Sequence, residues 1–174
     1  MKSDLHIKQR GATLAVSLLL LLVITLLAIS AVQVTQMQEK MSANMQNKEM
    51  SFASAETALV AGENWLLRQS RQPTLYTLCP SFPCVQEPYQ NLDFASQSDS
   101  WWKSNSAEYS STLKQASSKP RFIIEFLQFV PDSPVIGTSS SRSKGVYYYQ
   151  VTGRGYGFTD EAITVLQTTV GRRF

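Results

Sequence analysis

The sequence of 174 residues, the length of one ordinary domain, is poor in the residues that catalytic and metal sites need. It has one histidine, His6, and two cysteines, Cys79 and Cys84. Because His6 lies among the first eleven residues, a chain that has lost this segment has no histidine for a triad or a metal site. The remainder lacks zinc-ligand spacing and a serine-elbow motif, and its carboxylates are scattered singly. These absences argue against an enzyme, and they predict no cofactor, no metal site and no catalytic residue; whether the adjacent Asp160 and Glu161 bind calcium stays open.

The net charge is small outside the first eleven residues. The formal net charge of +3 includes a net +2 from residues 1–11, which hold three basic residues and one acidic residue. Since little net positive charge is left for the remaining residues, the basic composition is weak evidence for a nucleic-acid surface, and no such partner is predicted.

Residues 12–32 contain no charged side chain, and neither glycine nor proline occurs between Ala12 and Ala61. A helix of 21 apolar residues spans roughly 31 Å, the thickness of a bilayer's hydrocarbon core. Beyond it, larger or apolar residues recur at helical spacing, at Val34, Met37, Met41, Met45, Phe52, Ala55, Leu59 and Leu66. The pattern predicts one helix from Ala12 to Arg68, with a transmembrane half (residues 12–32) and an amphipathic half (residues 33–71) that packs on a globular domain (residues 72–174).

The basic residues Lys2, Lys8 and Arg10 predict the orientation of this helix in the membrane. By the positive-inside rule, they place the amino terminus in the cytoplasm and the globular domain in the periplasm. The alternative is a secretory signal cleaved near Ala28 and Ser30, which would release a soluble chain beginning at Ala31. The length of the apolar run and the helical pattern that continues beyond it favour an uncleaved membrane helix.

Cys79 and Cys84 are separated by four residues in a segment that reads as loops. A metal site would need further Cys or His ligands, and a redox motif normally has two intervening residues. In an oxidising periplasm the pair therefore predicts a structural disulfide.

A serine-rich stretch, residues 96–118, includes Trp101, Trp102 and Tyr109. One interpretation is a surface excursion whose aromatic side chains attach it to the core. The other makes Trp101 and Trp102 an exposed contact for a partner protein, because aromatic residues concentrate at interface hot spots. The sequence does not choose between the two.

Three segments near the carboxyl terminus are rich in β-branched and aromatic residues: residues 121–130, 145–153 and 162–170. The gaps between them leave no room for a crossover helix, so we expect an antiparallel meander covered on its inner face by the amphipathic helix. Gly153, Gly155 and Gly157 are interpreted as turn residues of the second gap. The expected fold class is α+β.

The amino-terminal residues resemble a known family. A basic leader ending in Gly11, followed by the apolar string ATLAVSLLLLLVITLLAISAV and an amphipathic helix, resembles the type IV prepilins, and in particular the PilX-type minor pilins. The resemblance implies a pilin-like fold and cleavage of the leader, residues 1–11, between Gly11 and Ala12 by a prepilin peptidase. It also implies N-methylation of Ala12.

The fifth mature position, Val16, departs from most of this family, which carries a glutamate there. That acid docks on the amino terminus of a neighbouring subunit, and family members that lack it are placed at the fibre tip. The resemblance therefore implies a minor pilin that helps to initiate and cap a type IV pilus, in support of twitching motility, adhesion or DNA uptake.

The same resemblance implies the location and the partners of the chain. It would reside in the inner membrane and then in the cell-surface pilus, and its partners would be other minor pilins, the major pilin and the inner-membrane assembly platform. Two alternatives stay open: a tip pseudopilin of a type II secretion system, and a periplasmic adhesin or receptor domain anchored by one helix.

Overall fold

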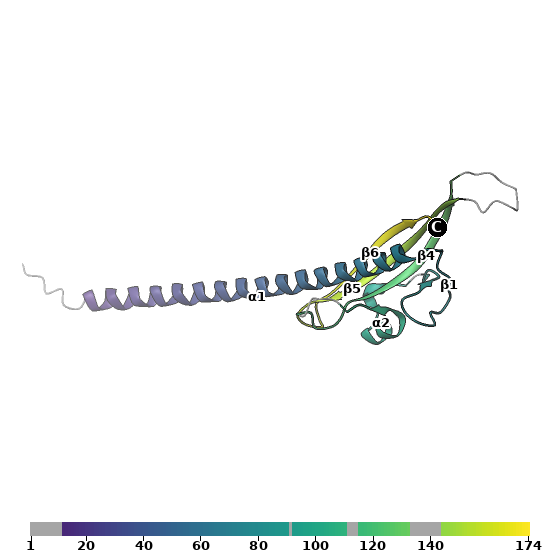
Figure 1. Cartoon of the computed structure of the whole chain (residues 1–174). Helices are drawn as coiled ribbons and strands as arrows, with labels where there is room; N and C mark the ends of the chain where they lie inside the picture. Colours follow the sequence, from purple (N-terminus) through teal and green to yellow (C-terminus); the bar gives the residue numbers. More distant parts are fainter. Residues whose placement is uncertain (1–11, 91, 111–114, 133–143) are drawn as a thin grey trace, which may run out of the picture. The chain divides into compact units, whose positions relative to one another are not determined.

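The structure, a computed structural model, describes residues 12–90, 92–110, 115–132 and 144–174. These residues fall into two compact units, the helical residues up to Asn44 and a domain from Met45 to Phe174. The elements in chain order are α1 (Ala12–Arg68), β1 (Leu75–Tyr76), β2 (Val85–Gln86), η1 (Phe94–Ser96), α2 (Asp99–Asn105), β3 (Ala107–Glu108), β4 (Arg121–Pro131), β5 (Gly145–Tyr156) and β6 (Ile163–Arg172) (Figure 1).

Helix α1 has the bounds that the sequence predicts, 57 residues without a break. In its apolar half, the hydroxyls of Ser17, Thr25 and Ser30 donate to carbonyl oxygens three or four residues earlier, at 2.8–2.9 Å. These bonds satisfy the polar side chains inside the helix itself, so they do not interrupt the apolar surface. The helix ends where the Gln69 N–H donates to the Leu66 carbonyl, a tighter bond typical of a last turn.

The three long strands form the predicted antiparallel meander, β4–β5–β6. The sheet as a whole is mixed, which differs from the antiparallel sheet that we expected. Strands β1 and β2, of two residues each, add to β4 in parallel, and β3 pairs with the start of β4 in antiparallel. Strands of two residues have no periodicity to detect, so the sequence did not indicate them.

The face of α1 that packs on the sheet is lined by small residues. The fully or nearly buried positions of the helix are Ser51, Ser54, Ala55, Ala58, Gly62 and Leu66. The prediction that the larger apolar residues form the buried stripe was therefore wrong in part: Ala55 and Leu66 are buried, whereas Met45 and Phe52 are exposed. Small side chains let the helix backbone approach the sheet closely, and the packed face then has few large residues to signal it.

The glycines of β5 explain how close this approach is. A Cβ atom added to Gly153 would lie 2.9 Å from the Ala55 carbonyl oxygen, and one added to Gly155 would overlap the backbone of residues 51–55. Gly153 and Gly155 therefore lie inside β5, under the helix, and their interpretation as turn residues was wrong. Only Gly157 follows the strand, and there the Asn47 side chain accepts hydrogen bonds from the Phe158 and Thr159 N–H groups.

Candidate functional site

The apolar half of α1 is the first candidate surface. Its side chains are exposed, and α1 is a helix long and apolar enough to cross a membrane. Ala12 is the first residue of the helix, and the predicted cleavage partner Gly11 lies outside the described residues. The arrangement is consistent with anchoring by a single membrane span.

Val16 lies one turn into this helix and is 57% exposed. The helix has no acidic side chain before Glu39, so an exposed apolar surface continues from Ala12 to beyond the predicted span. A valine avoids the cost of placing a carboxylate at membrane depth, roughly 2.5 kcal/mol or somewhat less for a protonated acid, and it cannot accept a hydrogen bond from a neighbouring amino terminus.

The predicted disulfide joins Cys79 and Cys84, whose Cα atoms are 6.1 Å apart. Cys84 is buried and directly precedes β2, which pairs with the middle of β4. The bridge therefore fastens an otherwise irregular loop to the sheet. Directly before this loop, Leu78 is 78% exposed, the highest exposure of any large apolar residue in the described chain.

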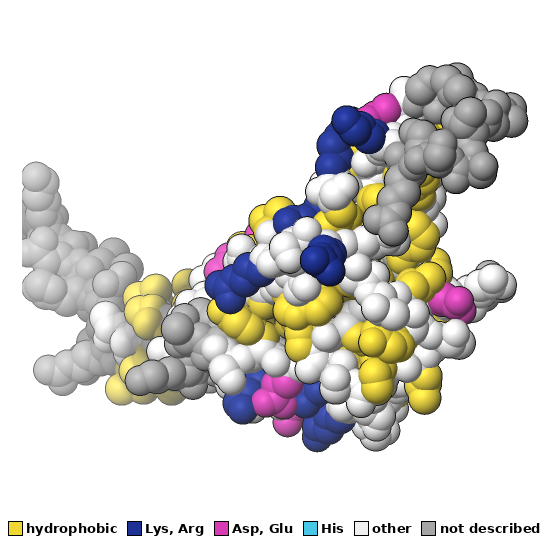
Figure 2. Space-filling view, turned by 45° about the vertical axis from the view of Figure 1, so that its right-hand side comes forward, with side chains coloured by type: hydrophobic (Ala, Val, Ile, Leu, Met, Phe, Trp, Pro, Cys, Tyr) yellow, Lys and Arg dark blue, Asp and Glu magenta, His cyan; other side chains and the backbone are white. Residues whose placement is uncertain are grey.

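A shallow groove of about 290 Å³ lies beside this loop. Trp65, Phe82, Pro83 and Tyr109 contribute its apolar lining, and Arg68 adds a charge at the end of α1. Figure 2 shows one face of the molecule, on which apolar side chains form several patches separated by polar and charged ones. This surface was not predicted from the sequence, although large apolar residues in a proline-rich loop were a signal for it.

The η1 and α2 elements, at the start of the serine-rich stretch, form a second layer on the sheet, opposite α1. Trp102 is fully buried, and its indole Nε1–H donates to the Phe94 carbonyl at 3.3 Å. Trp101 is half-buried and packs edge-on against Trp102 and Tyr89, with ring centroids 5.7 and 5.6 Å apart. The segment is thus attached to the core by its aromatic residues, and Trp102 is not an exposed partner contact because the sheet covers it. Trp101 keeps part of its surface exposed.

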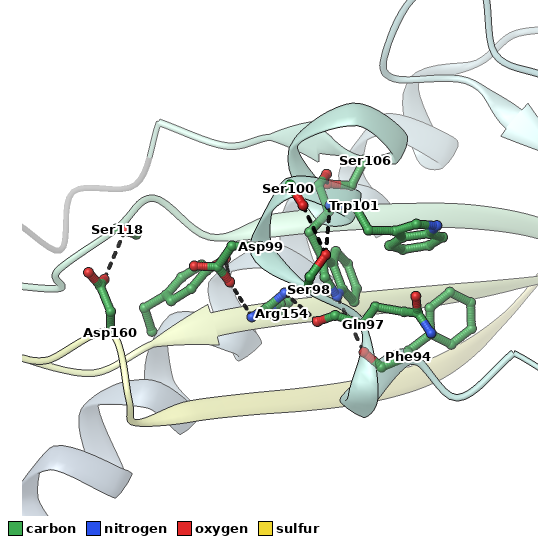
Figure 3. A network of polar contacts seen from close by, with 12 residues as sticks. Phe94, Gln97, Ser98, Asp99, Ser100, Trp101, Ser106, Ser118, Arg154 and Asp160 are labelled. Atoms are coloured by element: carbon green, nitrogen blue, oxygen red, sulfur yellow. Dashed lines mark hydrogen bonds and ion pairs between the residues drawn. The ribbon is translucent and has the colours of Figure 1, made fainter.

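A buried arginine holds this layer in place (Figure 3). Arg154 of β5 is 3% exposed; its guanidinium pairs with the Asp99 carboxylate and donates to the Gln97 carbonyl at 3.2 Å. The same group lies over the rings of Trp102 and Tyr156, at 5.5 and 5.1 Å from their centroids. Burial raises the pKa of the Tyr156 hydroxyl, so this phenol stays neutral. These contacts are structural, since the guanidinium is buried and its contacts lie within the layer; Asp99 and Tyr156 also line a neighbouring cavity of about 260 Å³.

Across the described ranges, no group of three or more His, Cys, Asp or Glu side chains is placed to hold a metal ion. The two candidate surfaces described above, the apolar half of α1 and the aromatic groove, suit contacts with other proteins.

Neither the curated proteins nor the solved structures include a significant match. Two family descriptions do match: residues 10–60 match the PilX N-terminal family, and residues 41–172 match the family described as type IV pilus assembly protein PilX, C-terminal part. Because the second match alone spans most of the chain, this protein belongs to the PilX family of type IV pilus assembly proteins.

Proposed function

We propose that the chain is a minor pilin that initiates a type IV pilus and remains at its tip. The observation that carries this proposal is Val16, an apolar residue where most pilins have the acid that docks on the preceding subunit. A first subunit has no predecessor and needs no such acid. The uncharged helix surface from Ala12 to beyond the membrane span supports the same role.

Before assembly the apolar half of α1 is stored in the inner membrane, and the globular domain lies in the periplasm. On assembly, contact with lipid is exchanged for contact with the helices of neighbouring pilins, so that the apolar surface stays out of water throughout. The partners in this role are other minor pilins, the major pilin and the inner-membrane assembly platform. The exposed part of Trp101 and the aromatic groove beside Trp65 are candidate contacts with them.

Maturation by the prepilin peptidase belongs to this proposal. The mature chain is expected to begin at Ala12, with a methylated amino group, and Gly11→Val is expected to block the cut. Amino-terminal sequencing and mass measurement of the membrane protein test this. Recovery of a soluble chain beginning at Ala31 would contradict it.

The tip pseudopilin of a type II secretion system is the runner-up, because it shares the leader and the missing acid. That protein usually carries a large inserted helical domain. Apart from α1, the helices of the described residues are α2, with seven residues, and η1, with three. These two short helices are much smaller than such an inserted domain, which favours a pilus protein over a secretion-system pseudopilin.

Deletion of the gene tests initiation. A first subunit determines how many fibres start, so deletion should sharply lower the number of pili per cell without merely shortening them. Immunogold label against the globular domain should appear at pilus ends. Normal pilus numbers, with label spread evenly along the shafts, would refute the proposed role, and a chain carrying Gly11→Val is the matched control because it is made but not matured.

A further inference from the structure

The two edges of the sheet are built differently. The short strands β1, β2 and β3, of two residues each, lie on one side of the sheet, and the disulfide-bonded loop lies beside them. The other edge is β6, ten residues long, which pairs only with β5 in the described part of the chain (Figure 1). Short strands and irregular cover are usual devices against unwanted strand pairing. The first edge has them and the second does not.

The sequence of β6 also lacks the residues that protect an edge. From Ile163 to Gly171 it has no proline and no charged side chain, and it is rich in threonine, valine and isoleucine. The first charge is on Arg172, whose guanidinium donates to the Gln69 carbonyl at the end of α1. Nothing in the strand itself repels a further strand.

The hydrogen bonds show which backbone groups face this edge. The Ala162 carbonyl accepts from the Gly157 N–H at 2.8 Å, toward β5, whereas the Ile163 carbonyl accepts from the Lys48 ammonium at 2.9 Å. Because successive residues of a strand point their backbone groups to opposite sides, the even-numbered residues bond β5 and the odd-numbered residues face outward. The outward N–H and C=O groups of Val165, Gln167, Thr169 and Gly171 have no partner among the described residues.

We propose that this edge, Val165–Gly171, is an interaction surface that receives an extended, uncharged segment of another pilus protein as an added antiparallel strand. Paired donors and acceptors repeating every two residues, about 6.7 Å, match the backbone of another strand. Beside Leu166, Thr168 and Val170, which α1 half-buries, the added strand should carry apolar side chains. On the opposite face, next to the exposed Gln167 and Thr169, it should carry polar ones.

A second copy of this chain fits the edge poorly. The Met45–Arg68 part of α1 runs in the same direction as β6, since Ser51 contacts Thr164 at 2.6 Å and Gln69 contacts Arg172. Antiparallel pairing of two β6 strands would therefore run the two Met45–Arg68 segments in opposite directions. We therefore assign the strand to a different polypeptide, and its identity as a pilus component rests on the proposed function.

Site-specific photo-crosslinking in cells that assemble the pilus tests the surface. A photoreactive amino acid at Thr169 of the full chain should give an adduct with one other polypeptide, mapped by mass spectrometry to an extended segment of alternating polarity. The same probe at Ser104, exposed on α2, is the matched control and should not give this adduct. Adducts only between two copies of this chain, or none at Thr169, would overturn the inference.

A proline substitution then tests the backbone contact. Thr169→Pro removes one outward N–H and leaves the bonds to β5, whereas Thr169→Val keeps the N–H and suits a strand. The adduct from a probe at Gln167 should fall at least about tenfold with Thr169→Pro and persist with Thr169→Val. Protection of the Thr168 and Val170 amides from hydrogen exchange reports the fold; if proline disturbs it, Thr169→Lys replaces it. An adduct that is undiminished in a folded variant would contradict the proposal.

These results separate the inference from the proposed function. If the deletion strain makes normal pili while Thr169 still links to another protein, the tip role fails and the edge contact stands. If deletion abolishes pili and a Thr169→Pro chain restores them with the Gln167 adduct intact, the tip role stands and the edge contact fails.

Discussion

At the scale of single residues, Gly155 shows how the domain depends on close contact. Any side chain at this position would enter the backbone of residues 51–55 in α1, a part of the structure that cannot rotate away as a flexible side chain can. The sequence showed a Gly-x-Gly-x-Gly run, and its local pattern suited a turn. Its real role depends on a helix about one hundred residues earlier, and no local pattern contains that information.

We predict that Gly155→Val destabilises the domain by about 3 kcal/mol or more, because the helix must move off the sheet. Denaturant unfolding of the detergent-solubilised chain, followed by tryptophan fluorescence, measures this. Gly171→Ala is the control: its Cβ would meet only the side chains of Tyr148 and Val146, at 3.2 Å, and should cost less than about 1 kcal/mol. Equal effects of the two substitutions would contradict the close-packing account.

We predict that the stability of the domain depends on pH through the buried carboxyl of Glu125. Burial raises the pKa of this carboxyl above its ordinary value of 4.5, although the Tyr89 N–H, 2.8 Å from its oxygen, opposes the shift. A carboxyl whose pKa is higher in the folded chain than in the unfolded chain binds its proton more tightly when folded. The free energy of unfolding therefore falls as pH rises from about 4.5 toward the raised pKa.

Glu125→Gln should remove this loss, because an amide oxygen still accepts from the Tyr89 N–H without ionising. Unfolding curves at several pH values between about 4 and 7 should show the free energy of unfolding of the variant rising relative to the wild type as pH rises. The pKa of Glu108 shifts in the opposite direction, since hydrogen bonding to Lys119 lowers it. Because Glu108 is present in both the wild type and the variant, its effect cancels in the difference between them. A constant difference between the two chains across this range would contradict the assignment.

At the scale of elements, the sequence predicted what depends on long uninterrupted patterns. The bounds of α1 followed from the stretch without glycine or proline up to Ala61 and from the helical spacing that continues to Leu66, and the three long strands followed from β-branched and aromatic runs. Helix α2 was not predicted, because its seven residues are serine-rich and too short to be stable alone. Tertiary contacts hold it: Trp102 inside the layer and Asp99 paired with a buried arginine on β5.

We predict that Asp99→Asn loosens this layer. Loss of the carboxylate leaves the Arg154 guanidinium buried without its counter-charge, and because Asp99 is itself half exposed the cost should be about 2 kcal/mol. The comparison is Asp132→Asn, which breaks the exposed pair with Arg173 at 2.6 Å and should change stability little, because solvent screens this pair. Hydrogen exchange should show faster exchange across α2 in the first variant and no change in the second. Unchanged exchange there would show that the aromatic contacts suffice.

At the scale of the whole molecule, the test concerns where the subunit sits. Val16→Glu should leave membrane insertion intact, because one acid near a helix end can protonate or find a donor. It should also create the docking carboxylate and let the subunit follow another pilin. Immunogold label should then move from pilus ends to positions along the shafts, whereas Val16→Gln, which adds no charge, should stay at the ends. Identical labelling of the two variants would show that this position does not set placement.

The small-residue face of α1 has a consequence for how the chain can vary. The buried face of α1, which packs on the sheet, includes Ser51, Ala55, Ala58 and Gly62. Bulky side chains of the same helix, such as Phe52, Val60 and Leu67, are exposed to solvent. One helix thus serves two separate tasks on two separate sides. A substitution on the outer side is free to retune attachment to neighbouring subunits while the domain keeps its stability, and a variant that folds normally yet fails to join a fibre is the expected signature of that independence.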